Sequence, residues 1–334
     1  MRKTFNLGEN IFGNVVVNVT HMEKQTYGHW YVWGTITNNI TTLTLSMNNP
    51  RSVKKLIALL QEEYNNANSV SRGTLNDKYN CEPQKSFVGY HHSVTTFPNE
   101  DAKFYIGVEN EILFFDGDER ENFISNNECK YLRFERDSSL GLHGCETITN
   151  PLTPSDATNE ETYYFLDDIK AWGFDTKTKD PSHHYGLHIN VGMGAFVGDT
   201  HKGKTIALYH LICRKKWVGN IFCRPMRDMY YHEHAINAHE YILREYESEG
   251  FLGALDACRI SGKLQDINIK TYALEFRRGR ATTSKKRIVA IVEFILLLID
   301  FCKSQRFKMD ERTFIAFALE NAKSETLKQN LLGA

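Results

Sequence analysis

Residues 104–118, FYIGVENEILFFDGD, place two glutamates inside a run of strand-forming residues. Side chains alternate between the two faces of a β-strand, so Glu109 and Glu111 share one face. Two neighbouring carboxylates repel each other unless their face is solvated or lies beside a positive charge. The segment therefore predicts a strand with one face in the core and one that is either solvated or binds cations. The core face is apolar apart from Asn110, with Ile106, Val108, Ile112 and Phe114.

The chain as a whole has 334 residues, which allows one large domain or two. Its 40 basic and 41 acidic residues nearly balance, so there is no general attraction to nucleic acid or to an anionic membrane. The seven cysteines are scattered without a C-x-x-C pair, which argues against a disulfide framework and favours a reducing cytosol. The most apolar run, residues 288–301, is short for a membrane span and contains Glu293 and Asp300. We therefore expect a cytoplasmic protein without a membrane partner. The oligomeric state stays open.

The pattern along the chain predicts a smaller β-rich N-terminal module, residues 1–100, followed by an α+β domain, residues 101–334. Short antiparallel strands are expected within residues 1–47, a helix at 51–65 and a connector from about 65 to 100. In the second domain, strands are predicted at 104–115, 130–137, 144–149, 185–197 and 270–277, and helices at 155–172, 203–217, 229–248, 285–303 and 311–328.

Four of the predicted strands carry ionisable or polar residues opposite their apolar faces: Glu109 and Glu111, then Glu146, then His188 and Asn190, then Glu275 and Arg277. Taken singly, each has a plainer interpretation as a solvated carboxylate, a structural histidine or an ion pair. If the strands form one antiparallel sheet backed by helices, the polar faces converge. Glutamates are ligands that Mg²⁺ accepts, and an arginine and a histidine beside the metal can clamp a phosphoryl group in transfer. The set predicts a site for ATP and Mg²⁺.

The same segments resemble the amidoligase branch of the glutamine synthetase and glutamate–cysteine ligase superfamily. GVENEILFFD is similar to its opening Gly-x-Glu-x-Glu strand, and DSSLGLHGCETITNPLT to its Asp-x-Ser-Leu, Gly-x-Glu and Pro-Leu stretch. GLHINV resembles its Gly-x-His-x-x-Val strand, and LEFRRG its closing Glu-Phe-Arg strand. The four matches keep the family's order and cover about residues 104–280, whereas the first 100 residues match nothing in it.

The resemblance implies a curved, mainly antiparallel sheet backed by helices, and ATP-dependent joining of a small-molecule or peptide carboxylate to an amine through an acyl phosphate. It implies that glutamates hold Mg²⁺ or Mn²⁺, that His188 and Arg277 act in catalysis, and that these two and Asn190 contact the nucleotide. The acyl donor and the amine acceptor stay open. A non-catalytic binding or assembly protein that keeps the ligase fold is the alternative. The implied metal ligands are Glu109, Glu111, Glu146 and Glu275.

A rival motif spans Gly198 to Thr205, which fits the P-loop pattern G-x-x-x-x-G-K-[ST] and raises the alternative of a P-loop NTPase. A P-loop follows a buried parallel strand, whereas residues 188–194 alternate as a half-exposed strand does. The P-loop is therefore the weaker hypothesis. Lys204 still qualifies as a cofactor-binding residue that contacts phosphate from a loop beside the sheet.

Two further polar stretches receive structural interpretations. The histidines of HEHAINAHE, residues 232–240, are spaced by two, five and seven positions, which does not fit a zinc-protease helix. We expect a charged, solvated helix there. Asp137 precedes two serines and a glycine, and we expect it to shape that turn.

Overall fold

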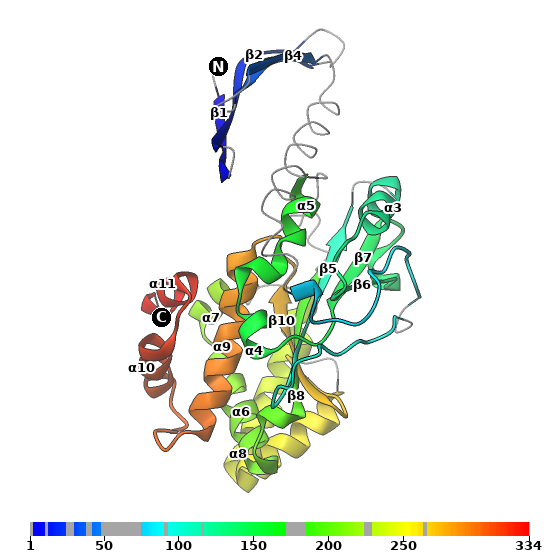
Figure 1. Ribbon diagram of the computed structural model, residues 1–334. Helices are drawn as coiled ribbons and strands as arrows, with labels where there is room; N and C mark the ends of the chain where they lie inside the picture. Colours follow the sequence, from blue (N-terminus) through cyan, green and yellow to red (C-terminus); the bar gives the residue numbers. More distant parts are fainter. Residues whose placement is uncertain are drawn as a thin grey trace. The chain divides into compact units, whose positions relative to one another are not determined.

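The computed structural model divides the chain into two compact units, residues 1–77 with 167–173 and residues 78–166 with 174–334 (Figure 1). The boundary predicted near residue 100 lies inside the second unit. The reason is that residues within 78–89 and 93–100 bond to that unit; for example, the Arg136 N–H donates to the carbonyl of Val88. The structure describes residues 3–10, 13–24, 30–37, 42–47, 75–89, 93–114, 117–171, 185–223, 229–262 and 266–333.

The first unit contains a four-stranded antiparallel sheet in sequence order, as the alternation of residues 1–47 predicts. Each strand pairs with the next one along the chain. The helix predicted at 51–65 and the start of the connector lie outside the described residues. The strands are β1 (Lys3–Asn10), β2 (Gly13–Lys24), β3 (Trp30–Thr37) and β4 (Thr42–Met47).

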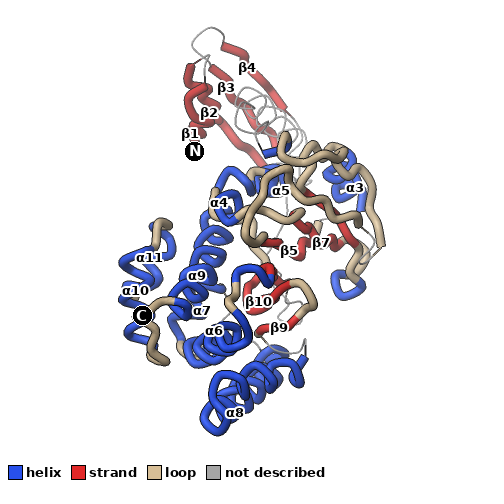
Figure 2. Tube along the Cα trace, turned by 60° about the horizontal axis from the view of Figure 1, so that its bottom comes forward, coloured by secondary structure: helices blue, strands red, loops and turns tan. Residues whose placement is uncertain are grey.

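The second unit is built on a six-stranded antiparallel sheet in the order β6-β7-β5-β8-β10-β9. Its strands β5 and β7 lie side by side in Figure 2. This confirms the α+β class and the antiparallel pairing. The sheet does not curl, which corrects the expected curvature; its edge strands β6 and β9 have only four and three residues and leave it open. The strands are β5 (Ile106–Leu113), β6 (Leu132–Glu135), β7 (Gly144–Thr149), β8 (Gly186–Gly192), β9 (Ile267–Ile269) and β10 (Ala273–Arg280).

Helices cover the apolar face of this sheet. The ring of Tyr209 on α6 packs edge-on against Phe276 on β10, with centroids 5.2 Å apart. Behind α6, rings from α7 and α9 continue the core, since Phe222 contacts both Tyr209 and Phe294. The helices are α3 (Gly117–Ser125), α4 (Pro154–Ala157), α5 (Phe165–Ala171), α6 (Gly198–Cys213), α7 (Lys216–Phe222), α8 (Met229–Ser261), α9 (Lys285–Lys303), α10 (Glu311–Asn321) and α11 (Glu325–Leu332).

The only polar residue on the apolar face of β5, Asn110, is buried and ties the strand to the segment before α9. Its side-chain amide donates to the carbonyl of Thr282 at 3.1 Å, and its side-chain oxygen accepts from the Thr282 N–H at 3.2 Å. A buried amide with both groups bonded avoids the cost of a desolvated polar atom. The interruption of the apolar pattern therefore fixes the start of α9.

Several predicted helices differ from those observed. The stretch 311–328 forms two helices, because Glu293 accepts hydrogen bonds from the N–H groups of Lys323 and Ser324 and Ser324 starts α11. The stretch 155–172 breaks into α4, a short 3₁₀ turn and α5. α8 runs on to Ser261 with an interruption at Gly250, whose φ is 71°. Within the described ranges, no helix has both the length and the apolar character required to cross a bilayer.

Candidate functional site

Strand register brings the predicted site residues onto one face of the six-stranded sheet. Glu111 on β5 lies opposite Glu146 on β7, and Glu109 lies opposite His188 on β8. Further along, Asn190 on β8 lies opposite Glu275 on β10. Residues that pair directly in antiparallel strands point to the same side of the sheet. The prediction that the four polar faces form one surface, opposite the helices, is therefore confirmed, whereas the roles of the residues stay predictions.

His188 lies between two carboxylates. Its Nδ1 atom is 3.5 Å from Glu109 Oε2 and 3.9 Å from Glu275 Oε1. Asn190 Nδ2 donates a hydrogen bond to the other oxygen of Glu109 at 2.7 Å. Ligand atoms of Glu109, Glu146 and His188 all lie within 4.8 Å of one another. This spacing is small enough for one cation to contact all three residues.

Gly186 leaves space for the ring of His188 and for Glu111. Its N–H donates a hydrogen bond to the Glu111 carboxylate. A Cβ at this position would lie 2.6 Å from His188 Nε2 and 3.3 Å from each Glu111 carboxylate oxygen. The absence of a side chain at Gly186 therefore gives His188 and Glu111 the space that they occupy.

Cations surround Glu275 at the β9–β10 end of the face. Its Oε1 atom is 3.0 Å from both Lys270 Nζ and Arg277 Nη1, and its Oε2 accepts from Asn268 Nδ2 at 2.8 Å. Lys270 Nζ is also 3.5 Å from Glu109 Oε1. Burial opposes the charge of Lys270, yet the two carboxylates outweigh it and raise the lysine's pKa. Arg277 thus lies where it was predicted, beside Glu275.

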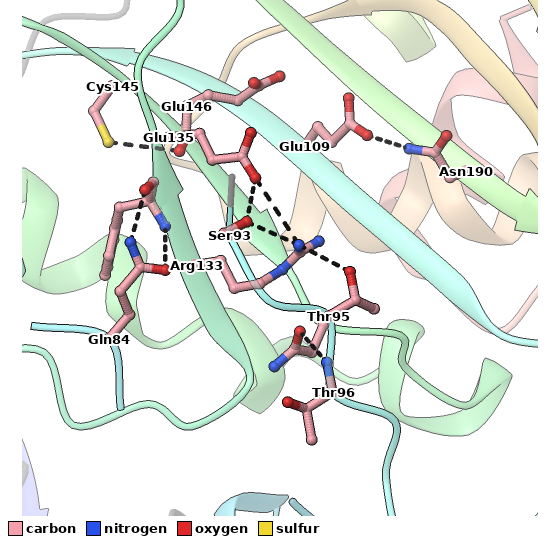
Figure 3. A network of polar contacts seen from close by, with 12 residues as sticks. Gln84, Ser93, Thr95, Thr96, Glu109, Arg133, Glu135, Cys145, Glu146 and Asn190 are labelled. Carbon is pink, nitrogen blue, oxygen red and sulfur yellow. Dashed lines mark hydrogen bonds and ion pairs between the residues drawn. The ribbon is translucent and has the colours of Figure 1, made fainter. Parts of the chain in front are cut away.

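The β6 edge contributes a further carboxylate, Glu135, which lies opposite Glu146. Ser93 donates its hydroxyl to Glu135, while Arg133 Nη1 lies 4.0 Å from that carboxylate. Arg133 also donates to Ser93 at 2.9 Å and to Thr95 at 3.0 Å. Figure 3 shows the carboxylate of Glu135 in contact with Ser93 and Arg133, and that of Glu109 turned toward Asn190.

Two residues of this face, Glu135 and Lys270, are not among the residues singled out from the sequence. The sequence around each residue does alternate between polar and apolar side chains. Arg133 and Glu135 alternate with buried Leu132 and Phe134, and Asn268 and Lys270 alternate with Ile267 and Ile269. Edge strands of four and three residues are too short for this alternation to stand out without a neighbouring strand.

The close carboxylates titrate very differently. Burial, followed by the charges of Glu109 and Glu111, raises the pKa of Glu146 to about 9. Burial acts in the same sense on Glu109, but hydrogen bonding to His188 and the charge of Lys270 outweigh it and lower its pKa to about 2. Without a bound ion, Glu146 therefore holds a proton at neutral pH. A divalent cation bound to Glu146 would replace that proton as the source of positive charge.

The P-loop pattern does not form a loop. Residues 198–205 are the first turns of α6, and the strand before them, β8, is antiparallel to both of its neighbours. Lys204 lies among the helices, with its ammonium 4.7 Å from the ring centroid of Phe307 and 5.8 Å from that of Phe251. Its expected position in a loop beside the sheet is therefore wrong. Lys204 and Gly203 pack against neighbouring side chains and backbone, whereas Gly198 starts the helix with a positive φ of 73°.

The histidine-rich stretch also differs from its prediction. His239 is buried rather than solvated; its Nδ1 lies 2.7 Å from Nδ1 of His210, and its Nε2 lies 3.1 Å from Asp266. The side chains of the other two histidines lie outside the described residues. Asp137 behaves as predicted, because its carboxylate accepts from the N–H of Ser139 at 2.7 Å and caps the turn.

Comparison with known proteins adds no relative to this geometry. No protein family matches the sequence, and no curated protein matches it either. The function must therefore be argued from the polar face of the sheet, whose residues are Glu109, Glu111, Glu135, Glu146, His188, Asn190, Lys270, Glu275 and Arg277.

Proposed function

We propose that the protein is an ATP- and Mg²⁺-dependent carboxylate–amine ligase. The observation that carries the proposal is the convergence of Glu109, Glu146 and His188, whose ligand atoms lie within 4.8 Å of one another. Mg²⁺ prefers oxygen ligands and usually binds one or two protein carboxylates together with waters and substrate phosphates. Mn²⁺ accepts the same oxygens and also suits imidazole. The donor set fits such an ion, and the proton that burial places on Glu146 marks where positive charge is required.

Further carboxylates lie on both sides of the Glu109, Glu146 and His188 cluster, which favours more than one cation. Glu135, Glu146 and Glu111 follow one another across β6, β7 and β5. Glu109 and Glu275 instead flank His188. Two hard cations bound to these groups would bridge the phosphates of a nucleotide to the sheet and neutralise their charge.

The residues at the β10 end suit the transfer itself. The acyl substrate's carboxylate attacks the γ-phosphorus of ATP, ADP leaves, and an acyl phosphate forms. An amine then attacks the acyl carbon, phosphate leaves, the amine nitrogen loses a proton, and an amide results. Arg277, anchored on Glu275 at 3.0 Å, is placed to stabilise charge on the phosphoryl group in transfer. His188 has both carboxylates beside its Nδ1 atom and would contact the nucleotide phosphates or a metal.

The proposal is tested by incubating the full chain with ATP, Mg²⁺ and a pool of amino acids and amines. We expect ADP release together with a product lighter than the sum of two reactants by one water, detected by mass spectrometry. Glu109→Gln and Arg277→Gln should each lower the rate by at least about a hundredfold, since the first removes a ligand of the metal and the second removes a cation that stabilises developing charge. Equal turnover in these variants and the wild type would remove the site from the mechanism.

Two controls separate the alternatives. Calorimetry with millimolar ATP and Mg²⁺ should show nucleotide binding; its absence would favour a binding or assembly protein without catalysis. Lys204→Ala should leave turnover unchanged, because its ammonium contacts Phe307 and Phe251 among the helices. A loss of hydrolysis in that variant alone, with Glu109→Gln active, would instead favour a P-loop NTPase.

A further inference from the structure

Lys270 holds a position between two carboxylates of the proposed metal site. Its ammonium is 3.0 Å from Glu275 Oε1 and 3.5 Å from Glu109 Oε1, and its side chain is 21% exposed. The residue lies just after β9, where its N–H donates to the carbonyl of Ala273 at 2.9 Å and closes the turn into β10. The adjoining Tyr272 is 71% exposed, so the turn borders solvent. The ammonium of Lys270 therefore reaches the two carboxylates from the solvent-exposed edge of the site, which we call its rim.

The site around Glu109 and Glu275 has more hydrogen-bond acceptors than one ammonium can bind. His188 Nδ1 is within 4 Å of both carboxylates. Asn190 is buried, and its Oδ1 has no hydrogen-bond partner among the described residues. The orientation of this amide follows from chemistry: a carboxylate only accepts, so the Nδ2 group must face Glu109 and Oδ1 is the atom left over. A buried acceptor without a donor beside two carboxylates indicates a ligand of higher charge or coordination number.

We propose that, in the ion-free protein, the Lys270 ammonium takes the place of a divalent cation between Glu109 and Glu275 and leaves it when the cation binds. This inference rests on the metal site of the proposed function. Mg²⁺ contacts carboxylate oxygens at about 2.1 Å, so it draws them closer than an ammonium does and repels that ammonium. Lysine suits the exchange because its charge lies at the end of a flexible four-carbon stem.

The displaced ammonium remains tethered at the rim by the turn between β9 and β10. Binding of the cation and release of the lysine are therefore coupled, so that Lys270 becomes free for an anionic group only once the metal is in place. The phosphates of a metal-bound nucleotide are such a group. Lys270 acts in this account as a positioning residue: its ammonium bridges Glu109 and Glu275 before the metal arrives.

The test measures binding of Mn²⁺ alone to the full chain, by the loss of the free-ion electron paramagnetic resonance signal. Lys270→Met keeps the length of the side chain and removes its charge. Because Mn²⁺ no longer competes with an ammonium, its dissociation constant should fall by about tenfold. Arg277→Gln is the matched control: Arg277 contacts Glu275 Oε1 at the same 3.0 Å as Lys270 does, whereas Lys270 also lies 3.5 Å from Glu109. It should tighten binding by about threefold or less.

The outcomes separate the two proposals. If the wild type and both variants bind no Mn²⁺, the metal site itself is wrong. If the wild type binds Mn²⁺ but Lys270→Met binds it equally, more weakly, or only as tightly as Arg277→Gln does, the metal site stands and the exchange is overturned. Thermal unfolding of each variant checks that the fold is intact.

A second measurement follows the Lys270 side chain in the wild-type protein. Reductive ¹³C-methylation of the lysines gives each ammonium its own resonance, and loss of one resonance in Lys270→Arg assigns it. Added Mg²⁺ should shift that resonance toward the position of a solvated dimethyl-lysine. An unchanged resonance at saturating Mg²⁺ would contradict displacement.

Discussion

Glu111 on β5 and Glu146 on β7 lie directly opposite each other on one face of an antiparallel pair. Like charges in this position destabilise a sheet unless a proton or a cation neutralises one of them. Burial and the charges of Glu109 and Glu111 leave that proton on Glu146, whose pKa is raised to about 9. Two facing carboxylates destabilise the sheet unless one of them is neutralised. Such a pair is typical of a binding site rather than of a sheet built only for packing.

Mg²⁺ should stabilise the second unit through this pair. At a concentration one hundred times its dissociation constant, a ligand that binds only the folded state adds about 2.7 kcal/mol to the free energy of unfolding. We expect thermal unfolding to move to higher temperature with added Mg²⁺ in the wild type and to stay in place in Glu146→Gln. Glu320→Gln, which changes an exposed carboxylate paired with Arg306, should keep the wild-type response. A full response in Glu146→Gln would contradict the assignment.

Gly186→Ala should weaken metal binding without unfolding the protein. The new Cβ would lie 2.6 Å from His188 Nε2, so the ring must turn away from Glu109 and Glu275. Loss of one ligand's orientation costs about ten- to a hundredfold in metal affinity. Gly107→Ala is the control, because its Cβ would meet the Cβ of Asn190 at 3.6 Å, an ordinary contact. Calorimetry with Mn²⁺ compares the two; equal affinities would show that the ring's position is unimportant.

The free energy of unfolding should fall in mild acid because of the buried His210, whose ring lies against His239. Burial, and then the neighbouring His239, hold the pKa of His210 well below its usual 6.5, while Asp266 opposes and Arg278 reinforces this shift. The unfolded chain therefore binds more protons below pH 6.5, and stability is lost as the pH falls from there, by up to about 1.4 kcal/mol per pH unit.

Urea unfolding at pH 7.5 and pH 5.5 measures this effect. His210→Gln keeps a polar side chain and cannot titrate, so its stability should differ less between the two pH values than that of the wild type. An unchanged difference would assign the acid sensitivity to other groups.

Asn110→Leu should destabilise the protein although it makes the face of β5 wholly apolar. The substitution leaves the N–H and carbonyl of Thr282 without the two bonds that the amide supplies, at 3.2 and 3.1 Å. Unsatisfied buried groups cost about 1–3 kcal/mol each. Asn126→Leu, at an exposed position, should change the free energy of unfolding by less than about 0.5 kcal/mol. Chemical denaturation of both variants gives the comparison, and equal effects would mean that Thr282 finds other partners.

Local patterns predicted several elements closely. The observed β7 and α9 have the bounds expected from the sequence, 144–149 and 285–303, because breaking residues flank each segment: Asn150 and Pro151 follow β7, and Ser284 and Ser304 flank α9. The polar faces of β5, β7, β8 and β10 were likewise visible as alternation. The broken helix before residue 328 was not, since its break depends on Glu293, some thirty positions earlier in the chain, bonding to Lys323 and Ser324.

The amino-acid sequence by itself determined which side of each strand is polar, because that property repeats every two residues and needs no partner. Only the tertiary structure decided which polar residues meet. Register between strands placed Glu135 beside Glu146, and the turn between β9 and β10 brought Lys270 to Glu109. The segment that matches the P-loop pattern forms the start of the packed helix α6. These relationships join residues distant in the chain, and the free energy of burying a whole sheet face fixes them together.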